Sequence, residues 1–245
     1  MRIAVLSDIH GNLPALQAVL AGLAPFDAVW QLGDICGYGP QPNEVVARLA
    51  EVGAIGVRGN HDAAALGELA TETFNDDARA AVEWTAGRLE PAARRWLGAL
   101  PVRLEVGAFT LVHGSPRDPT WEYVYSVPVA RSNLRRFATD HCLVGHTHVP
   151  LVFREAVAQD GGVRVETIAP DHRTALTLDT RRSIANPGSV GQPRDGDRRA
   201  SAMLLDTDGP TLEWRRVDYP VADVQRLMAR ARLPERLITR LQFGL

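Results

Sequence analysis

The stretch IAVLSDIH at residues 3–10 decides how the chain folds. Its four leading apolar residues, Ile3–Leu6, predict a short buried strand, and Asp8 and His10 follow directly after it. Asn12 then predicts the N-cap of a helix, because a proline and apolar residues at helical spacing come after it. A strand, a polar turn and an amphipathic helix in this order are typical of an α/β fold.

The same alternation continues over the following residues. Ala28–Leu32 predicts a second strand and Ala54–Val57 a third. Between them, a helix is expected to begin at Asn43 and to end at Gly53. Strands that alternate with helices in this way lie parallel to one another, with right-handed crossovers.

The later segments differ in character. Residues 62–100 are rich in alanine, leucine and arginine and predict a helical insertion. Two more strands, Phe109–Val112 and Cys142–Val144, are expected on either side of a helix at Val129–Phe137. The remainder is rich in expected strands, at Leu151–Phe153, Val163–Thr167, Ala175–Leu178, Ala202–Leu205 and Thr211–Val217, with hairpin-type turns at Gly161-Gly162 and Asp208-Gly209.

A βα-alternating half followed by a β-rich half predicts two sheets that share a core, with helices outside. Because no long linker interrupts the chain, residues 1–245 are expected to form a single domain.

Composition and charge exclude several classes of protein. Of the 245 residues, 45% are apolar, and 27 Lys and Arg oppose 29 Asp and Glu, for a net charge of −2. Nucleic-acid wrappers and polybasic membrane binders need a large positive excess, so neither kind of partner is indicated. No apolar run reaches the roughly 7–15 residues of a secretory signal or the roughly 18 of a membrane span, so we expect a cytoplasmic protein. Cys36 and Cys142 are expected to be buried thiols.

Polar side chains follow five of the expected strands, at the point where each strand ends. In chain order these groups are Asp8 and His10; Gly33 and Asp34; Gly59, Asn60 and His61; His113 and Gly114; and Gly145, His146, Thr147 and His148. Ligands of α/β sheets bind beyond the carboxyl ends of the strands, so we expect these groups to converge. His141 and His172 lie outside them and are expected to be structural.

Four histidines, two aspartates and an asparagine form a donor set that suits divalent transition metals. Seven ligands are too many for one tetrahedral ion, but they fit two ions that share a bridging carboxylate. Two divalent cations, two aspartates and a bridging hydroxide leave a net charge of about +1, which attracts an anion. Because a two-metal site is the usual clamp for displacement at phosphorus, the residues predict hydrolysis of a phosphate ester.

The chain resembles the calcineurin-like metallophosphoesterase superfamily, in its small bacterial and archaeal branch. The motifs that carry the resemblance are Asp8-x-His10, Gly33-Asp34, Gly59-Asn60-His61-Asp62, His113-Gly114, Gly145-His146-Thr147-His148 and Asn186-Pro187-Gly188-Ser189. The resemblance implies a four-layer αββα sandwich of two mixed sheets flanked by helices. It also implies two divalent ions, drawn from Mn, Fe, Zn or Ni, with these ligands: Asp8, His10 and His148 for the first, Asn60, His113 and His146 for the second, and Asp34 as the bridge.

His61 and Asp62 stand next to these ligands. By the same resemblance, His61 is similar to the histidine that donates a proton or a hydrogen bond to the reacting phosphate. A positioned general acid typically contributes about 10²–10⁴ in rate. Asp62 is expected either to orient His61 or, as a carboxylate at a helix N-terminus, to interact with the helix dipole.

One departure from the family concerns the second motif. In the phosphoprotein phosphatase branch this motif continues Gly-Asp-x-Val-Asp-Arg-Gly, and its arginine grips the phosphate, whereas residues 33–40 here are GDICGYGP. A phosphoserine or phosphothreonine protein phosphatase is therefore not expected. Arg117 and Arg194 are the candidates for contacting substrate instead, with solvated surface positions as the alternative. The nearby aromatic residues are expected to pack against the insertion, or alternatively to form a wall for a nucleobase: Trp121, Tyr123 and Tyr125.

The resulting hypothesis is a binuclear metal-dependent phosphoesterase that hydrolyses a small-molecule or nucleotide phosphodiester by means of a metal-bridging hydroxide. A dinucleoside polyphosphate hydrolase and a phosphomonoesterase are alternatives. A metal-independent protein-binding scaffold of the same fold is an alternative from another class, and the seven filled ligand positions disfavour it. The expected partner is a small phosphate ester or a nucleotide, and no membrane is involved.

Overall fold

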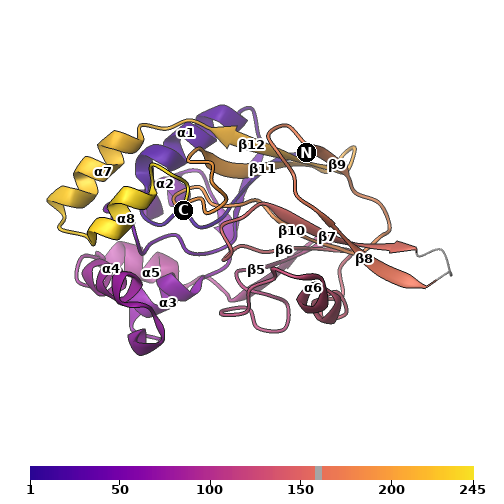
Figure 1. Ribbon diagram of the computed structural model, residues 1–245, viewed down its shortest axis with the longest axis horizontal. Helices are drawn as coiled ribbons and strands as arrows, with labels where there is room; N and C mark the ends of the chain where they lie inside the picture. The colour runs from indigo at the N-terminus through magenta and orange to yellow at the C-terminus, as the bar shows by residue number, and fades with distance from the viewer. Residues whose placement is uncertain (158–161) are drawn as a thin grey trace.

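The computed structural model describes residues 1–157 and 162–245, and this part of the chain contains two six-stranded sheets (Figure 1). In spatial order the first sheet consists of β3 (Ile55–Gly56), β2 (Ala28–Gln31), β1 (Arg2–Leu6), β11 (Ala200–Asp206), β12 (Thr211–Val217) and β9 (Ala175–Thr177). The second consists of β4 (Arg103–Val106), β5 (Phe109–Val112), β6 (His141–Leu143), β10 (Ser183–Asn186), β7 (Leu151–Val157) and β8 (Val163–Ile168).

Both sheets are mixed. β1, β2 and β3 pair in parallel, as the strand–helix alternation predicts, and β11 pairs antiparallel with β1. In the second sheet β5, β6 and β10 are parallel, while β4 and β7 flank them in antiparallel pairing. Each sheet therefore has parallel strands at its centre or along one side, and the polar groups follow the carboxyl ends of these strands.

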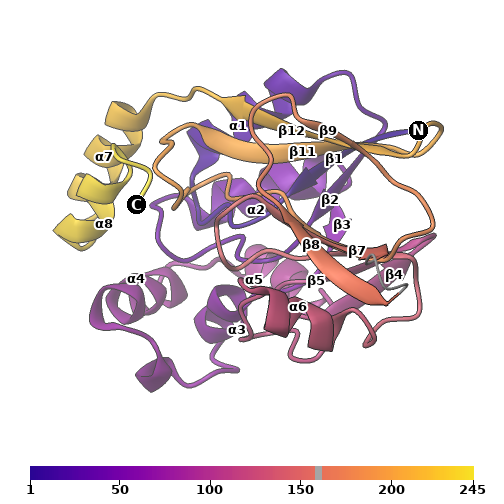
Figure 2. The same cartoon turned by 45° about the vertical axis from the view of Figure 1, so that its right-hand side comes forward.

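Alternating side chains divide the interior into layers. Ile3 and Val5 of β1 belong to the core between the two sheets, whereas Ala4 and Leu6 pack with helices on the other face. The helices that cover the first sheet are α1 (Leu13–Leu23) and α2 (Pro42–Glu51), and α6 (Val127–Asn133) packs on the second (Figure 1 and Figure 2). α7 (Val221–Arg230) lies beyond the end of the first sheet, next to α8 (Glu235–Arg240). The predicted four-layer sandwich is confirmed.

The helical insertion is also confirmed, and it begins at Asn60 rather than near residue 62. Its helices are α3 (Asn60–Leu66), α4 (Asp76–Ala86) and α5 (Pro91–Gly98), with a 3₁₀ turn at Thr71–Thr73. Asn75 caps α4, because its side-chain oxygen accepts a hydrogen bond from the backbone amide of Ala78 at 3.0 Å. This cap places the start of α4 beside the functional site described below.

Local predictions succeed or fail according to the neighbours of each residue. Asn12 caps α1 as predicted, by accepting from the amide of Ala15 at 3.1 Å. The prediction that Asn43 begins the second helix is wrong, because α2 already starts at Pro42. The Asn43 side chain instead bonds the backbone of Arg88 and Glu90, each at 2.9 Å, and so ties α2 to the start of α5.

Several elements were not predicted at all: β4, β10, α7 and α8 (Glu235–Arg240). α6 begins at Val127, two residues before its expected start, with a proline in its first turn. The turn expected at Asp208-Gly209 does join β11 to β12. The turn expected at Gly161-Gly162 involves Gly161, which lies outside the described residues.

Over the described ranges, no helix combines the length and the apolar character needed to cross a membrane.

Candidate metal centre

The polar residues that follow the strands meet at one end of the sandwich. Asp8 and His10 follow β1, Asp34 follows β2, and Asn60 begins α3 after β3. The second sheet contributes His113 after β5, and His146 and His148 after β6. All seven are at most 4% exposed. Burying this many polar and ionisable groups is unfavourable unless they pair with one another or bind a cation.

Six of the seven residues form two clusters that share one carboxylate. Asp8, His10, Asp34 and His148 form the first cluster, and Asp34, His113 and His146 form the second. Within each cluster the donor atoms all lie within 4.8 Å of one another. Asp34 Oδ2 lies 3.6 Å from His10 Nε2 and 3.4 Å from His113 Nε2, so one oxygen faces both clusters.

Asn60 adds an amide oxygen to the second cluster. Its Oδ1 lies 3.1 Å from His113 Nε2, and His113 Nε2 in turn lies 3.0 Å from His146 Nδ1. In the first cluster, His148 Nε2 lies 3.2 Å from both His10 Nε2 and Asp8 Oδ1. The convergence predicted from the strand ends is therefore present in the structure.

Backbone carbonyls orient all four imidazole rings. In each of these histidines, the ring nitrogen that points away from the centre lies within hydrogen-bond distance of a backbone carbonyl oxygen. The pairs are His10 Nδ1 with the carbonyl of Cys36 (3.1 Å), His113 Nδ1 with that of Leu32 (2.8 Å), His146 Nε2 with that of Trp121 (3.2 Å) and His148 Nδ1 with that of Gln192 (2.6 Å). A carbonyl only accepts hydrogen bonds, so each of these nitrogens carries a proton, and the other nitrogen is the one that can present a lone pair to a metal ion.

This donor set fits metal ions. The ring nitrogens that face the centre lie 3.0–3.2 Å apart in two pairs, His10 with His148 and His113 with His146. Nitrogens about 2.1 Å from one ion and at right angles to each other would be about 3.0 Å apart, which matches these pairs. The structure thus contains two buried His/Asp clusters consistent with a binuclear metal site.

The electrostatics of the centre also favour a cation. Burial lowers the pKa of His61 to about 4 and that of His146 to about 3. Burial opposes a charge on His113 too, but the nearby Asp34 outweighs it and raises the pKa of His113 to about 9. Although burial disfavours ionisation of Asp34, His113 and the other surrounding imidazoles hold the pKa of its carboxyl well below the ordinary value. The two buried carboxylates therefore attract positive charge into the centre.

The backbone at the ligand positions is unusual. Asp8, His10, Asp34, His146 and His148 have φ between 49° and 67°, in the left-handed region. Among the described non-glycine residues, only Arg173 and Arg232 share this conformation. A left-handed residue immediately after a strand turns the chain sharply, and such strain is maintained where the surrounding structure requires it, commonly at functional sites.

Two of the neighbouring glycines are required by close approach. A Cβ atom on Gly59 would lie 2.1 Å from Asp34 Oδ1, and a Cβ atom on Gly145 would lie 2.0 Å from Ser7 Oγ. Ser7 Oγ itself donates a hydrogen bond to Asp8 Oδ2 at 2.6 Å. Any side chain at either glycine would push the two aspartates away from their positions in the clusters.

His61 and Asp62 have different surroundings. The backbone amide of His61 donates to Asp34 Oδ1 at 2.9 Å, and its buried Nδ1 has no hydrogen-bond partner among the described residues. Asp62 instead accepts from the backbone amides of Ile35, Cys36 and Gly59 at 2.9–3.0 Å. The carboxylate of Asp62 thus caps α3, the helix that carries His61, and holds the loop that follows Asp34.

The two candidate arginines also differ. Arg117 is 46% exposed and forms an ion pair with Glu122, and it does not line the cavity beside the clusters. Arg194 does line that cavity. Its Nη2 donates to the hydroxyl of Tyr38 at 3.2 Å and to Gln192 Oε1 at 3.0 Å, and no carboxylate pairs with it among the described residues.

The cavity beside the clusters has a volume of about 110 Å³. Several residues of its wall were not predicted from the sequence, notably Tyr38, Phe74 and Asn75. Tyr38 lies within the GYGP segment directly after Asp34, so its position in the motif was the one available signal. Phe74 and Asn75 come from the insertion, and only the tertiary structure brings them to the site.

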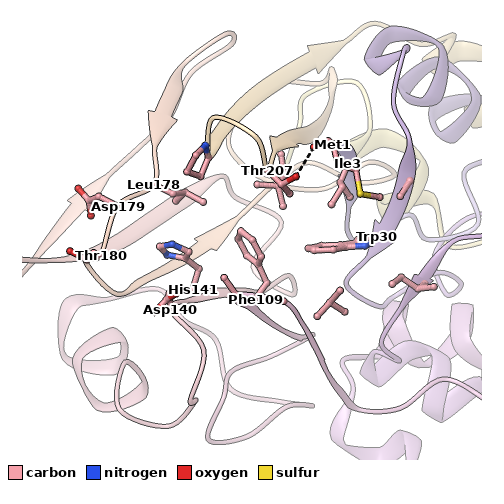
Figure 3. Close-up of a pocket in the computed structure, with 17 residues that line it drawn as sticks. Met1, Ile3, Trp30, Phe109, Asp140, His141, Leu178, Asp179, Thr180 and Thr207 are labelled. Atoms are coloured by element: carbon pink, nitrogen blue, oxygen red, sulfur yellow. Dashed lines mark hydrogen bonds between the residues drawn. The ribbon is translucent and has the colours of Figure 1, made fainter.

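A larger cavity, of about 730 Å³, lies at the opposite end of the strands (Figure 3). Its walls include Ile3, Ala28 and Phe109, which lie near the amino ends of β1, β2 and β5, and the ring of Trp30. Asp140 and His141 are polar residues on its edge, but His141 Nδ1 is bonded to Ser183 Oγ at 2.9 Å. This cavity contains no member of the two clusters.

Comparisons with known proteins agree with this geometry. Residues 1–209 match the model of the calcineurin-like phosphoesterase superfamily domain. Over 99% of the chain and 98% of the relative, the sequence is 34% identical to Uncharacterized protein MJ0912 of Methanocaldococcus jannaschii. It is 29% identical to Phosphodiesterase YfcE of Escherichia coli, over 85% of this chain and 89% of that one.

Solved structures show the same fold. The crystal structure of a metallophosphoesterase from Sphaerobacter thermophilus is 46% identical, covers 100% of this chain and 99% of its own, and has a TM-score of 0.90. A hypothetical protein from Pyrococcus horikoshii is 22% identical with a TM-score of 0.79, which concerns the fold alone. The chain belongs to the calcineurin-like phosphoesterase superfamily, as the motifs predicted, and it is a metal-dependent phosphoesterase.

Proposed function

We propose that this protein is a binuclear phosphoesterase that hydrolyses a phosphodiester of a small molecule or nucleotide. The observation that carries the proposal is the pair of buried clusters that share Asp34. A site with two metal ions suits in-line displacement at phosphorus, because both the attacking and the leaving oxygen can be stabilised there.

The ligand assignment follows from the two clusters. Asp8, His10 and His148 would hold the first ion, Asn60, His113 and His146 the second, and Asp34 would bridge them. When bound, two divalent ions supply an activated water and neutralise charge on the phosphoryl oxygens. Mn, Fe, Zn and Ni all suit imidazole and carboxylate ligands, so availability and geometry select among them.

His61 is the proposed donor of a proton or a hydrogen bond to the reacting phosphate. Its ring lines the cavity, and the hydrogen bond from its amide to Asp34 fixes it beside the shared carboxylate. The unpartnered Nδ1 leaves hydrogen-bonding capacity unused in this structure. Asp62 is a positioning residue in this proposal, because its contacts hold the loops that carry Asp34 and His61.

Substrate charge is the main argument for a diester. A centre of net charge about +1 is neutralised by a singly charged phosphodiester, whereas a dianionic monoester leaves an uncompensated negative charge in a buried site. Arg194 is the one arginine of the two candidates that lines the cavity. Arg194 is therefore the proposed phosphate contact, whereas the pairing of Arg117 with Glu122 assigns it to the loop instead.

A substrate panel with Mn²⁺ tests this proposal. We expect kcat/KM to be higher for bis-p-nitrophenyl phosphate than for p-nitrophenyl phosphate, with negligible turnover of a phosphoserine protein. Diadenosine tetraphosphate in the same panel tests the alternative of a dinucleoside polyphosphate hydrolase. A monoester preference of tenfold or more, which corresponds to about 1.4 kcal/mol in transition-state binding, would contradict the proposed diester specificity.

A further inference from the structure

Aromatic side chains form much of the wall of the small cavity beside the clusters. The four rings belong to Tyr38, Phe74, Trp121 and Tyr123. Two of them are enclosed: the Tyr38 ring lies 4.5 Å from the rings of both His10 and His61, and the Phe74 ring lies 5.0 Å from His61. Trp121 packs edge-on against Phe74 at 5.3 Å. These contacts account for three of the four rings as packing.

Tyr123 is different. Its ring is stacked on the ring of His146, with centroids 3.9 Å apart and planes inclined by 15°. Yet Tyr123 is 49% exposed, whereas Tyr38 and Phe74 are buried. Since His146 covers one face of the ring, the exposed part of Tyr123 is its opposite face or its edge, and the residue also lines the cavity. A large aromatic ring held flat and half open beside a metal centre provides a surface on which a second planar ring can stack.

The loop that carries Tyr123 is held firmly. The carboxylate of Glu122 accepts hydrogen bonds from Ser115 Oγ at 2.6 Å, Asn133 Nδ2 at 2.7 Å and Arg117 Nε at 3.2 Å. Although burial opposes this charge, Arg117 and the other donors lower the pKa of Glu122 to about 2. A preorganised ring loses little conformational freedom on binding, so its contacts contribute more of their energy to affinity.

Positive charge lies next to this ring. Arg194 lines the same cavity, and Tyr38 and Gln192 hold its guanidinium in place. A ligand that places its phosphate at the clusters thus meets a guanidinium and a half-exposed aromatic ring beside the cavity. A phosphate joined to a planar ring matches this combination, whereas a phosphate joined to an alkyl chain leaves the ring of Tyr123 unused.

We propose that Tyr123 stacks against a planar ring of the substrate and selects nucleoside and aryl phosphate esters over alkyl phosphate esters of the same charge. This inference rests on the proposed function, because it places the phosphate at the metal clusters. Stacking of a base on an aromatic side chain corresponds to roughly 5- to 150-fold in affinity, so the preference is large enough to measure.

Equilibrium binding tests the proposal without turnover. Isothermal titration of the Mn²⁺-loaded protein compares thymidine 5′-monophosphate with methyl phosphate, which carry the same phosphate charge. We expect the thymidine ligand to bind at least about tenfold more tightly to the wild type. Tyr123→Leu is expected to weaken the thymidine ligand by at least about fivefold and to leave methyl phosphate within about twofold.

Two further variants separate stacking from other effects. Tyr123→Phe keeps the aromatic ring and is expected to retain the preference for the thymidine ligand. Tyr125→Leu is the matched control, because Tyr125 is 62% exposed on the same loop but does not line the cavity. Metal content, measured by elemental analysis, is expected to be equal in all four proteins. An equal loss of affinity for both ligands in Tyr123→Leu, or a loss of metal, would show that Tyr123 only packs on His146 and would overturn the proposal.

Hydrolysis of the p-nitrophenyl ester of thymidine 5′-monophosphate is measured separately. If the preference for the thymidine ligand depends on Tyr123 but no diester is hydrolysed, the stacking role stands and the proposed diesterase function fails. If diesters are hydrolysed but the leucine variant binds both ligands as the wild type does, the function stands and the stacking role is overturned.

Discussion

The two ends of the β-sandwich are built by the same strands but have opposite properties. At the carboxyl ends of β1, β2, β5 and β6, histidines and aspartates surround a cavity of about 110 Å³. At the amino ends of these strands, a cavity of about 730 Å³ is lined mainly by apolar side chains such as Ile3 and Trp30. The larger cavity contains neither of the two clusters of metal-binding residues, whereas the smaller cavity lies beside both.

The difference between the two ends shows that the metal-binding residues depend on the backbone conformation directly after each strand. Five residues of the clusters adopt left-handed φ, and carbonyl oxygens orient four imidazole rings. Such strain and such ordered hydrogen bonds are maintained only where they are needed. Volume alone would point to the wrong end of the molecule. The following predictions test whether the two ends differ in function as they do in structure.

The largest effect is expected at the carboxylate that both clusters share. Asp34→Ala should reduce the metal content of both sites and lower kcat/KM by at least about 10³-fold. Removal of a single electrostatic contact to the transition state typically lowers kcat by roughly 10²–10³-fold, and Asp34 serves both sites. His113→Ala is the comparison, because His113 belongs to only one cluster and its loss should chiefly empty one site. Elemental analysis after metal reloading checks both. A wild type that never exceeds one ion per chain would contradict the binuclear centre.

The next effect concerns His61, which lies beside the clusters without belonging to them. We expect His61→Ala to keep both ions and to lower kcat by about 10²-fold or more, as for the loss of a positioned proton donor. The loss should be smaller for a nitrophenyl ester than for an alkyl ester, because a good leaving group needs little protonation. A variant that loses metal together with activity would show that His61 is a ligand.

A smaller effect is expected for the two arginines. Arg194→Gln should raise KM for a phosphodiester by roughly tenfold, the scale of one charge-assisted hydrogen bond, with metal content unchanged. Arg117→Gln is the matched control and should leave KM within about twofold, because Arg117 contacts Glu122 rather than the cavity. Equal effects of the two substitutions would mean that the ion pair of Arg117 does not remove it from substrate binding.

The smallest effect on activity is expected at the opposite end. Ala28 lines the larger cavity near the start of β2, and Ala28→Leu adds apolar volume there. Cavity filling of this kind commonly stabilises a protein by about 0.5–2 kcal/mol, so thermal unfolding should shift upward while kcat and KM stay within about twofold. A tenfold change in kcat with intact metal content would show that the amino end is coupled to the chemistry.

The sequence alone predicted much of the fold and all seven of the proposed metal ligands. Strand, helix and turn signals near residues 3–57 are local, so the parallel β1–β2–β3 unit could be predicted from them. The ligands could be found because each lies next to a strand end in the chain, and strand ends meet in space. Asn43 was misassigned because a capping residue and a residue that bonds a distant backbone have the same local appearance.

The tertiary structure alone decided the roles of residues that act across the chain. Arg117 and Arg194 look alike in sequence, but one pairs with Glu122 and the other reaches Tyr38, 156 positions away. The stacking of Tyr123 on His146 likewise depends on how its loop packs against a distant segment. Local sequence sets the backbone conformation of a strand and of the turn after it, because the conformational preferences of the backbone depend on residues that are near neighbours in the chain. Which side chain is neutralised, covered or left open depends on contacts between distant segments, and only the folded chain contains them.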